Sequence, residues 1–369
     1  GFAALAVFLA ILVSALGGSR YQIGGPAGAF IVLVSATVAR FGIEGLLLTV
    51  LMSGLMLTVV GLTRLGSLIR YIPHPVTVGF TAGIAVTILA SQIRDLAGLS
   101  LSRPEPGPLV PKLAALAGAA PTVTPAALAL GLGVAAFILW LHRVRPNWPG
   151  MLYGVVGATL LAYLLHLPIE TIGTRFGELP RGLPLPSVPT FSPGLAMDVL
   201  PSALAFTLLG GVESLLSATV ADKMTGRVHR SNMELVAQGL ANVGSALFGG
   251  IAVTGTIART AANIRAGART PISGMLHAAF LLAFMLLAAP LASYVPLSAL
   301  AGVLVVVAWN MAEKEEFVAM ARDWRTGAVL FATFGLTLLH DLTAGIVAGC
   351  LLAAFLRLFT KAQGDGAHT

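Results

Sequence analysis

Two glycine-rich stretches interrupt the long apolar segments of this chain, and they constrain its fold more than any other feature. The first runs Gly24-Gly25-Pro26-Ala27-Gly28-Ala29-Phe30 and the second covers residues 249–260. Within a lipid bilayer, irregular backbone is tolerated only where it is buried in protein or lines a cavity. Two such breaks in corresponding halves of a chain are typical of a site built from discontinuous helices. We therefore predict two half-helix N-termini that face one small anion.

The apolar character of the rest of the chain predicts a polytopic membrane protein. Of its 369 residues, 57% are hydrophobic and 10% are charged, whereas soluble domains carry about 25% charged residues. The single cysteine, Cys350, leaves no basis for a disulfide framework or a cysteine-based metal site. The net charge of +7 comes from basic residues scattered through short loops, which argues against nucleic acid as a partner. We expect the lipid bilayer as the surroundings of the chain, with no cofactor and no bound metal.

Apolar runs bounded by glycine, proline and charged residues predict thirteen helical segments. They lie at roughly 3–18, 26–41, 44–62, 76–97, 124–142, 150–167, 196–221, 232–248, 257–267, 272–289, 295–310, 325–340 and 342–360. The segments that follow the two breaks are second and ninth, seven apart. Because seven is odd, a repeat of seven helices would be inverted in the membrane.

This spacing predicts an all-α fold of two inverted repeats of seven helices, with a short strand before each half-helix. The repeats are 1–195 and 196–369, and the first is one helix short. We expect that an N-terminal helix is missing from this chain or undescribed, and that no STAS domain follows within it.

The distribution of basic residues predicts the orientation of the chain. If the thirteen segments alternate across the membrane, fifteen of the 22 lysine and arginine residues fall on one side and six on the other, with Arg259 inside a segment. Cytoplasmic loops carry the excess of lysine and arginine. We therefore place the C-terminus in the cytoplasm of a bacterium, with the chain in its inner membrane, and the long loops 98–123 and 168–195 on the outer side.

The first break supplies backbone donors for an anion. Pro26 suits the first turn of a helix, where its missing N–H is no loss, and the glycines let the backbone approach a ligand closely. The strand-like entry contains Gln22, a further candidate for contact with the substrate. The predicted donors are the free amides of Ala27, Gly28, Ala29 and Phe30.

The second break supplies a matching set of donors. The hydroxyl of Thr254 or Thr256 can cap the helix that starts near Ile257. Each helix N-terminus carries about half a positive charge, so two converging N-termini attract an anion and repel a cation. The predicted donors here are the free amides of Thr256, Ile257, Ala258 and Arg259.

Arg259 lies on the first turn of the second predicted half-helix, at mid-depth in the membrane, whereas the other basic residues lie in loops or near the membrane-surface ends of their segments. A charged group at bilayer depth costs at least about 2.5 kcal/mol on insertion scales, so it normally marks a substrate path or a buried pair. We predict that it binds the anion. The alternatives are a fixed ion pair with Glu213 and extension of the side chain to the cytoplasmic surface.

Glu213 and Ser217 lie one helical turn apart near the middle of segment 196–221 and share a face. Together they could form a small oxygen-lined site for a coupling proton or sodium ion. The alternative is a structural hydrogen bond to a neighbouring helix.

Other polar residues in apolar segments have structural interpretations. Asn232, Glu234, Gln238 and Asn242 recur at spacings of two to four residues, which favours hydrogen bonds between helices. His277 is predicted to be a packed, hydrogen-bonded histidine, with a proton relay as the alternative. The chain contains no zinc-protease, nucleophile-elbow or Walker motif, so we do not expect an enzyme.

Several of these motifs resemble the SulP sulfate-permease family, also called solute carrier family 26. The resemblance covers nearly the whole chain and is most specific between residues 213 and 274. It rests on the following stretches: Gly17-Gly18-Ser19-Arg20, Glu213-Ser214-Leu215-Leu216, Ala221-Asp222-Lys223-Met224-Thr225-Gly226, His229-Arg230-Ser231-Asn232-Met233-Glu234-Leu235, Gln238-Gly239-Leu240-Ala241-Asn242, Phe248-Gly249-Gly250 and Ala258-Arg259-Thr260-Ala261-Ala262-Asn263-Ile264-Arg265.

The resemblance implies fourteen helices arranged as a gate domain and a core domain, and a dimeric assembly. It also implies that the anion lies between the two half-helices, with Glu213 and Ser217 beside a cation-coupling position. The predicted function is secondary active transport of a small anion by alternating access, with a proton favoured over sodium as the coupling ion. An uncoupled anion channel and a nucleobase:cation symporter of the same fold remain as alternatives.

Overall fold

The computed structural model describes residues 11–28, 30–66, 73–103, 105–106, 108–146, 148–177, 185–340 and 342–365. These residues are mostly helical and contain one two-stranded sheet. The chain divides into two compact units, each assembled from two separate stretches of sequence. Unit 1 comprises residues 1–71 and 180–289, and unit 2 comprises residues 72–179 and 290–369.

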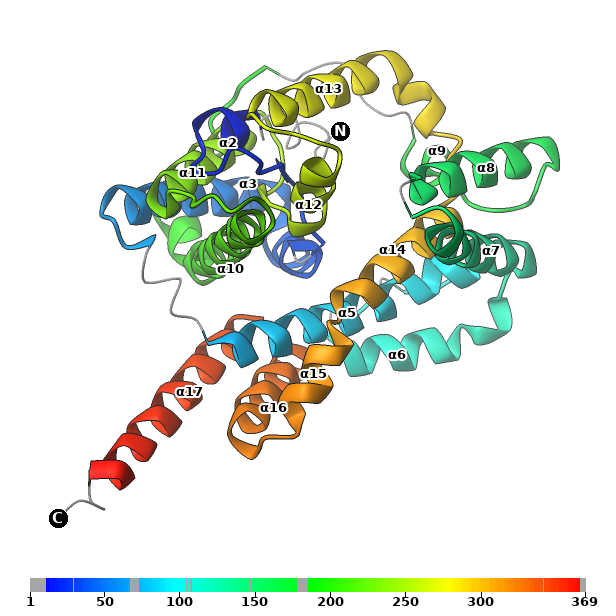
Figure 1. Cartoon of the computed structure of the whole chain (residues 1–369). Helices are drawn as coiled ribbons and strands as arrows, with labels where there is room; N and C mark the ends of the chain where they lie inside the picture. The colour runs from blue at the N-terminus through cyan, green and yellow to red at the C-terminus, as the bar shows by residue number, and fades with distance from the viewer. Residues whose placement is uncertain are drawn as a thin grey trace. The chain divides into compact units, whose positions relative to one another are not determined.

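Unit 1 contains both glycine-rich breaks. Its long helices α3 and α10 pack against each other, and α11 packs against α3 and α2 (Figure 1). Its elements are α2 (Ile11–Leu16), β1 (Gly24–Gly25), α3 (Phe30–Leu62), α10 (Pro193–Thr225), α11 (Ser231–Leu247), β2 (Thr254–Gly255), α12 (Ile257–Arg265) and α13 (Ile272–Ala292), whose last residues belong to unit 2.

Helix α3 joins two segments that the sequence predicts separately, 26–41 and 44–62. The junction is Gly42, whose φ of 70° lies in the left-handed region that glycine adopts without steric cost. Farther along, α3 crosses α11 where Gly54 faces Gly239. A Cβ on Gly54 would lie 2.7 Å from the amide nitrogen of Val243, so this crossing requires glycine. Small residues let membrane helices pack backbone to backbone in this way.

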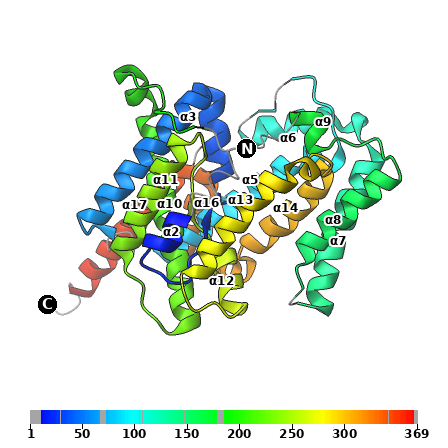
Figure 2. The same ribbon diagram turned by 90° about the horizontal axis from the view of Figure 1, so that it is seen from above.

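Unit 2 is built around α5, which packs against α14 and α16. Helices α7 and α8 lie side by side (Figure 2) and share an apolar cluster with α14 that includes Leu130, Val134 and Val306. Its elements are α5 (His74–Ala97), α6 (Leu109–Gly118), η1 (Ala120–Thr122), α7 (Pro125–Val144), α8 (Gly150–Leu164), α9 (Ile172–Phe176), α14 (Leu297–Met311), α15 (Lys314–Ala321), α16 (Trp324–Leu339) and α17 (Leu342–Asp365).

Five described stretches of helix are long and apolar enough to cross a membrane, by length and composition. They are 30–62, 74–97, 125–144, 193–225 and 297–321. The predicted long loops differ from the structure, because 98–123 contains α6 and η1 and 168–195 contains α9. These elements are only three to ten residues long, too short for the hydropathy window that predicts a spanning segment.

Candidate functional site

The two breaks meet in unit 1 through the short sheet. Strands β1 and β2 pair antiparallel, with Gly24 opposite Gly255 and Gly25 opposite Thr254. β1 leads toward α3, and β2 leads directly into α12. The predicted strand before each half-helix is therefore present, and the pairing joins two breaks that lie about 230 residues apart in sequence.

The first half-helix begins later than predicted. α3 starts at Phe30, not at Pro26, and residues 26–28 belong to neither the strand nor the helix. The amide of Phe30 donates to the carbonyl of Ala27 over 3.1 Å, and the amide of Ile31 donates to Gly28 over 3.1 Å. The prediction of a free Phe30 amide is thus wrong, because this amide closes the turn before the helix.

Two of the other predicted donors at this break lie in the part of the chain that the structure describes. The amides of Ala27 and Gly28 have no hydrogen-bond partner among the described residues, whereas Ala29 lies outside those residues. The Phe30 ring is buried and packs edge-on against Phe206, with 5.2 Å between ring centroids.

The second half-helix begins at Ile257, as predicted. Thr256 occupies the N-cap position, but its amide and its hydroxyl both donate to the carbonyl of Ile23, each over 3.1 Å. The Thr254 hydroxyl donates to the carbonyl of Gly210. Neither threonine side chain therefore caps the helix, and the Thr256 amide is not free, because the neighbouring chain competes for these donors.

The remaining amides at the start of α12 are open. The first bond from α12 back to the N-cap residue runs from the amide of Thr260 to the carbonyl of Thr256. No described residue accepts the amides of Ile257, Ala258 and Arg259, and the first two residues are exposed. The N-terminal donors of this half-helix are available to a ligand.

Arg259 links the two breaks through its guanidinium. Its Nη2 donates to the carbonyl of Pro26 over 3.1 Å, whereas its Nη1 is buried without a partner among the described residues. A buried donor without a partner costs about 1–3 kcal/mol. The Nη2 nitrogen of the guanidinium therefore has a structural role, and the Nη1 nitrogen lacks an acceptor among the described residues.

Glu213 lies on α10, near enough to Arg259 for the two charges to interact. No ion pair joins the two side chains among the described residues, and Glu213 Oε2 is buried without a partner. The alternative of a fixed Arg259–Glu213 pair is thus not observed. Because Glu213 and Arg259 are not paired with each other, each of them can interact with an ion of opposite charge.

Ser217 has a different environment from Glu213. Its hydroxyl donates to Thr260 Oγ1 over 3.1 Å, and the same Thr260 oxygen accepts the amide of Ile23 over 3.1 Å. Ser217 therefore ties α10 to α12 and to the strand entry. Of the two predicted coupling residues, only Glu213 has an atom without a partner.

Gln22 is held by its amide nitrogen. Nε2 donates to the carbonyl and to the hydroxyl of Ser214, over 3.0 and 2.9 Å. Its Oε1 is buried without a partner among the described residues. Because this oxygen is an acceptor, it suits a water or a hydroxyl group rather than a bare anion.

The polar residues of α11 support both breaks. Glu234 is fully buried and accepts the amide of Ser19 over 3.1 Å. Asn242 exchanges two bonds of 2.9 Å with the backbone of Val253, and Gln238 donates to the same Val253 carbonyl. Hydrogen bonding was predicted for these residues, but their partners are mostly the irregular segments before β1 and β2 rather than other helices.

His277, on α13, was predicted to be a packed, hydrogen-bonded histidine, but no hydrogen bond to its ring is found among the described residues. Its Nε2 is buried without a partner among the described residues. The ring lies near enough to Arg259 to interact with its charge. A proton relay was the alternative prediction for this residue, which is the only histidine in the apolar segment 272–289.

The close approach of the strands gives one test of this packing. A Cβ at Gly255 would overlap the Gln22 amide nitrogen, which is fixed by its two bonds to Ser214. Gly255→Ala should therefore cost about 2 kcal/mol through loss of these buried bonds, measured as a lower melting temperature in detergent. Gly335→Ala is the control, since Gly335 lies in a helix with nothing within 4 Å of its Cβ position.

A double variant tests whether the loss comes from overlap with Gln22 or from any substitution of Gly255 in the strand. In a Gln22→Ala background, Gly255→Ala should add little further loss, because the overlapping side chain is gone. Equal losses in both backgrounds would contradict the proposed overlap.

The fold and the site together define a class of protein. The chain is a helical membrane protein in which two helices follow paired strands, and the described residues leave several backbone donors and one arginine nitrogen at these helices without partners. Irregular backbone of this kind inside a membrane protein is typical of transporters, where half-helix N-termini point at anionic groups.

Comparison with known proteins identifies the family. The sulfate permease family model matches residues 5–333, and the chain belongs to this family. It is 41% identical over 366 residues to the Bacillus subtilis protein YvdB, covering 96% of this chain and 68% of that protein. It is 30% identical over 366 residues to the bicarbonate transporter BicA of Synechocystis, covering 96% of this chain and 63% of BicA.

A solved structure confirms the fold. The transmembrane domain of a cyanobacterial bicarbonate transporter BicA superposes with a TM-score of 0.83 at 30% identity, covering 93% of this chain and 88% of that chain. The predicted helical transporter fold is therefore correct. Members of this family are anion transporters that include bicarbonate transporters, and they are not enzymes.

Proposed function

We propose that this chain is a secondary active transporter of a small anion, of the sulfate, bicarbonate, chloride or dicarboxylate class. The observation that carries the proposal concerns the first turn of α12: Nη1 of Arg259 and the amides of Ile257 and Ala258 have no partner among the described residues. A guanidinium and a helix N-terminus both stabilise negative charge, and their effects add at one location.

The proposed anion site lies between the two breaks in unit 1. The amides of Ala27 and Gly28 on one side and of Ile257 to Arg259 on the other are its backbone donors. Ala29, Phe30 and Thr256 complete the predicted set. The amides of Phe30 and Thr256 and the Thr256 hydroxyl are already bonded, so we propose that these two residues shape the site rather than donate to the anion. Gln22 and His277 add one buried atom each that has no partner.

We place the coupling ion at Glu213, with Ser217 holding the adjacent helix. A carboxylate oxygen without a partner is a site where a proton or a sodium ion can bind. A proton is favoured over sodium, since the Ser217 hydroxyl, the second oxygen of the predicted sodium site, is already bonded to Thr260.

Both half-helices belong to unit 1, and this supports a rigid-body mechanism. We propose that unit 1 moves as one body during alternating access, carrying the anion between its two breaks. In this proposal the inverted repeats are 1–195 and 196–369, the protein is a homodimer, and it lies in a bacterial inner membrane with a cytoplasmic C-terminus.

An uptake panel in proteoliposomes tests this function. The anions are sulfate, bicarbonate, chloride and a dicarboxylate, with uracil as the nucleobase arm, each with an inward proton gradient, an inward sodium gradient or no gradient. We expect saturable uptake of at least one anion that a proton gradient accelerates. Uptake of uracil alone, or an anion conductance that no gradient changes, would contradict the proposal.

A further inference from the structure

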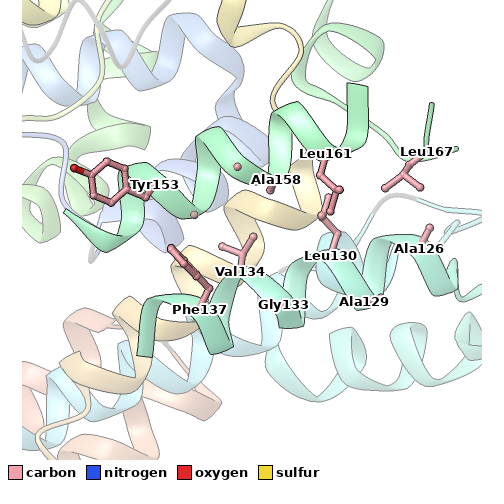
Figure 3. Close-up of a pocket in the computed structure, with 12 residues that line it drawn as sticks. Ala126, Ala129, Leu130, Gly133, Val134, Phe137, Tyr153, Ala158, Leu161 and Leu167 are labelled. Carbon is pink, nitrogen blue, oxygen red and sulfur yellow. The ribbon is translucent and has the colours of Figure 1, made fainter. Parts of the chain in front are cut away.

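A groove lies between α7 and α8 in unit 2, remote in sequence from both breaks. Its volume is about 440 Å³, and its lining side chains are apolar apart from the Tyr153 hydroxyl. Tyr153 and Phe137 lie at one end, and Ala126 and Leu167 lie at the other (Figure 3). This composition excludes an anion from the groove itself.

The groove exists because two glycines open the seam between the helices. Gly154 of α8 packs on α7, since its Cβ would lie 3.3 Å from Val134. Gly133 and Gly157 are exposed, and nothing lies within 4 Å of their Cβ positions. The helices therefore touch at Gly154, and space remains where the other two glycines carry no side chain.

The length of the groove matches one leaflet of a bilayer. From Ala126 to Phe137 the helix rises about 16 Å at 1.5 Å per residue, and half of a hydrocarbon core is about 15 Å. A helix with its side chains is about 10 Å wide, too wide for a space made by two missing side chains. An extended acyl chain has the matching length and width.

The Phe137 and Tyr153 end of the groove leads to a basic turn. Arg143 and Arg145 are exposed on this turn between α7 and α8, and neither forms an ion pair with a described residue. Trp140 and Trp148 are each 57% exposed nearby, with the Trp148 ring 5.8 Å from that of Tyr153. Aromatic and basic residues of this kind mark the headgroup level of a membrane.

We propose that the groove is a binding site for one anionic phospholipid. One acyl chain fills the space over Gly133 and Gly157, and the phosphate of the headgroup is held by Arg143 and Arg145. The two arginines supply the charge complementarity, since each basic residue near a membrane surface strengthens binding to anionic lipid. A neutral phospholipid would fill the groove equally well but would lack this attraction.

Native mass spectrometry of the delipidated protein tests the site. The probes are phosphatidylglycerol and phosphatidylcholine with identical acyl chains. We expect the first phosphatidylglycerol to bind about tenfold more tightly than the first phosphatidylcholine. The Arg143→Gln/Arg145→Gln double variant should bind both lipids equally, and Gly133→Leu/Gly157→Leu should weaken the first binding step for both.

Gly335→Leu is the matched control, because Gly335 is also a helical glycine of unit 2 with open space around it. It should bind both lipids as the wild type does. Equal binding of the two lipids to the wild type would overturn the proposal, as would unchanged binding to the filled-groove variant. Conversion of a dimer to a monomer by the filled-groove variant, with lipid binding unchanged, would identify a second copy of this chain as the occupant.

Quenching in the wild type tests the same site without any substitution. Phosphatidylglycerol with brominated acyl chains should quench tryptophan fluorescence at lower lipid fractions than brominated phosphatidylcholine, because Trp140 and Trp148 lie at the basic end. Identical quenching curves for the two lipids would overturn the assignment of Arg143 and Arg145.

Discussion

Arg259→Ala is expected to lower the kcat/KM of anion uptake about thirtyfold. Hydrogen bonds to charged groups contribute about 2 kcal/mol, and each 1.4 kcal/mol corresponds to a factor of ten. The variant removes the free Nη1 and also the bond from Nη2 to Pro26. Uptake of the transported anion into proteoliposomes, at matched protein content, measures the loss.

Two further variants separate anion binding from the structural bond to Pro26. Arg259→Lys keeps the charge but not the paired donors of the guanidinium, so its uptake should lie between wild type and Arg259→Ala. His277→Ala removes a ring near the same charge and should have a smaller effect.

The increase in melting temperature that the anion causes is a readout that would not change if Arg259 had a purely structural role. Saturating anion should raise the melting temperature of the wild type, because a ligand that binds only the folded state stabilises it. The Arg259→Ala protein should lose this shift. If it retains both uptake and the shift, Arg259 is not part of the anion site.

Glu213→Gln is expected to abolish gradient-driven accumulation of the anion while leaving anion exchange measurable. The substitution preserves shape but removes the charge that a coupling ion neutralises. Uptake is measured with an inward proton gradient, an inward sodium gradient and no gradient. In the variant, uptake with the proton gradient should be no faster than uptake without a gradient. A variant that still concentrates anion in response to either gradient would contradict the assignment of Glu213.

Glu234→Gln is the matched control for this experiment. Glu234 is also a buried carboxylate of unit 1, but its oxygens accept the amide of Ser19 and the hydroxyl of Ser214. Its replacement should lower the melting temperature and leave the response to the gradient in place. Loss of coupling in both variants would show that the effect is not specific to Glu213.

Several features of the site were predictable because they depend on local sequence. The start of α12 at Ile257 follows from the glycine-rich stretch that ends at Gly255, directly before the helical segment. The strands before the half-helices follow from short runs rich in glycine and β-branched residues between helices. Positions of this kind are set by neighbouring residues.

Other features could not be predicted, because they depend on partners distant in sequence. Thr256 does not cap its own helix, since the Ile23 carbonyl, 233 residues away, accepts both of its donors. Ser217 donates to Thr260, and this contact removes its hydroxyl from the pair that the sequence suggested with Glu213. The spacing of residues along one helix gives no information about these contacts.

The sequence by itself determined that the chain is a helical membrane protein with two interrupted helices, since hydropathy and glycine content act over a few residues at a time. Only the tertiary structure decided which donors are left for a ligand. Where β1 pairs with β2, the Thr256 amide bonds to Ile23 and Nη2 of Arg259 bonds to Pro26, while Nη1 of Arg259 and Oε2 of Glu213 have no partner among the described residues. A buried polar group needs a partner, and packing between distant segments determines whether the protein or its ligand supplies it.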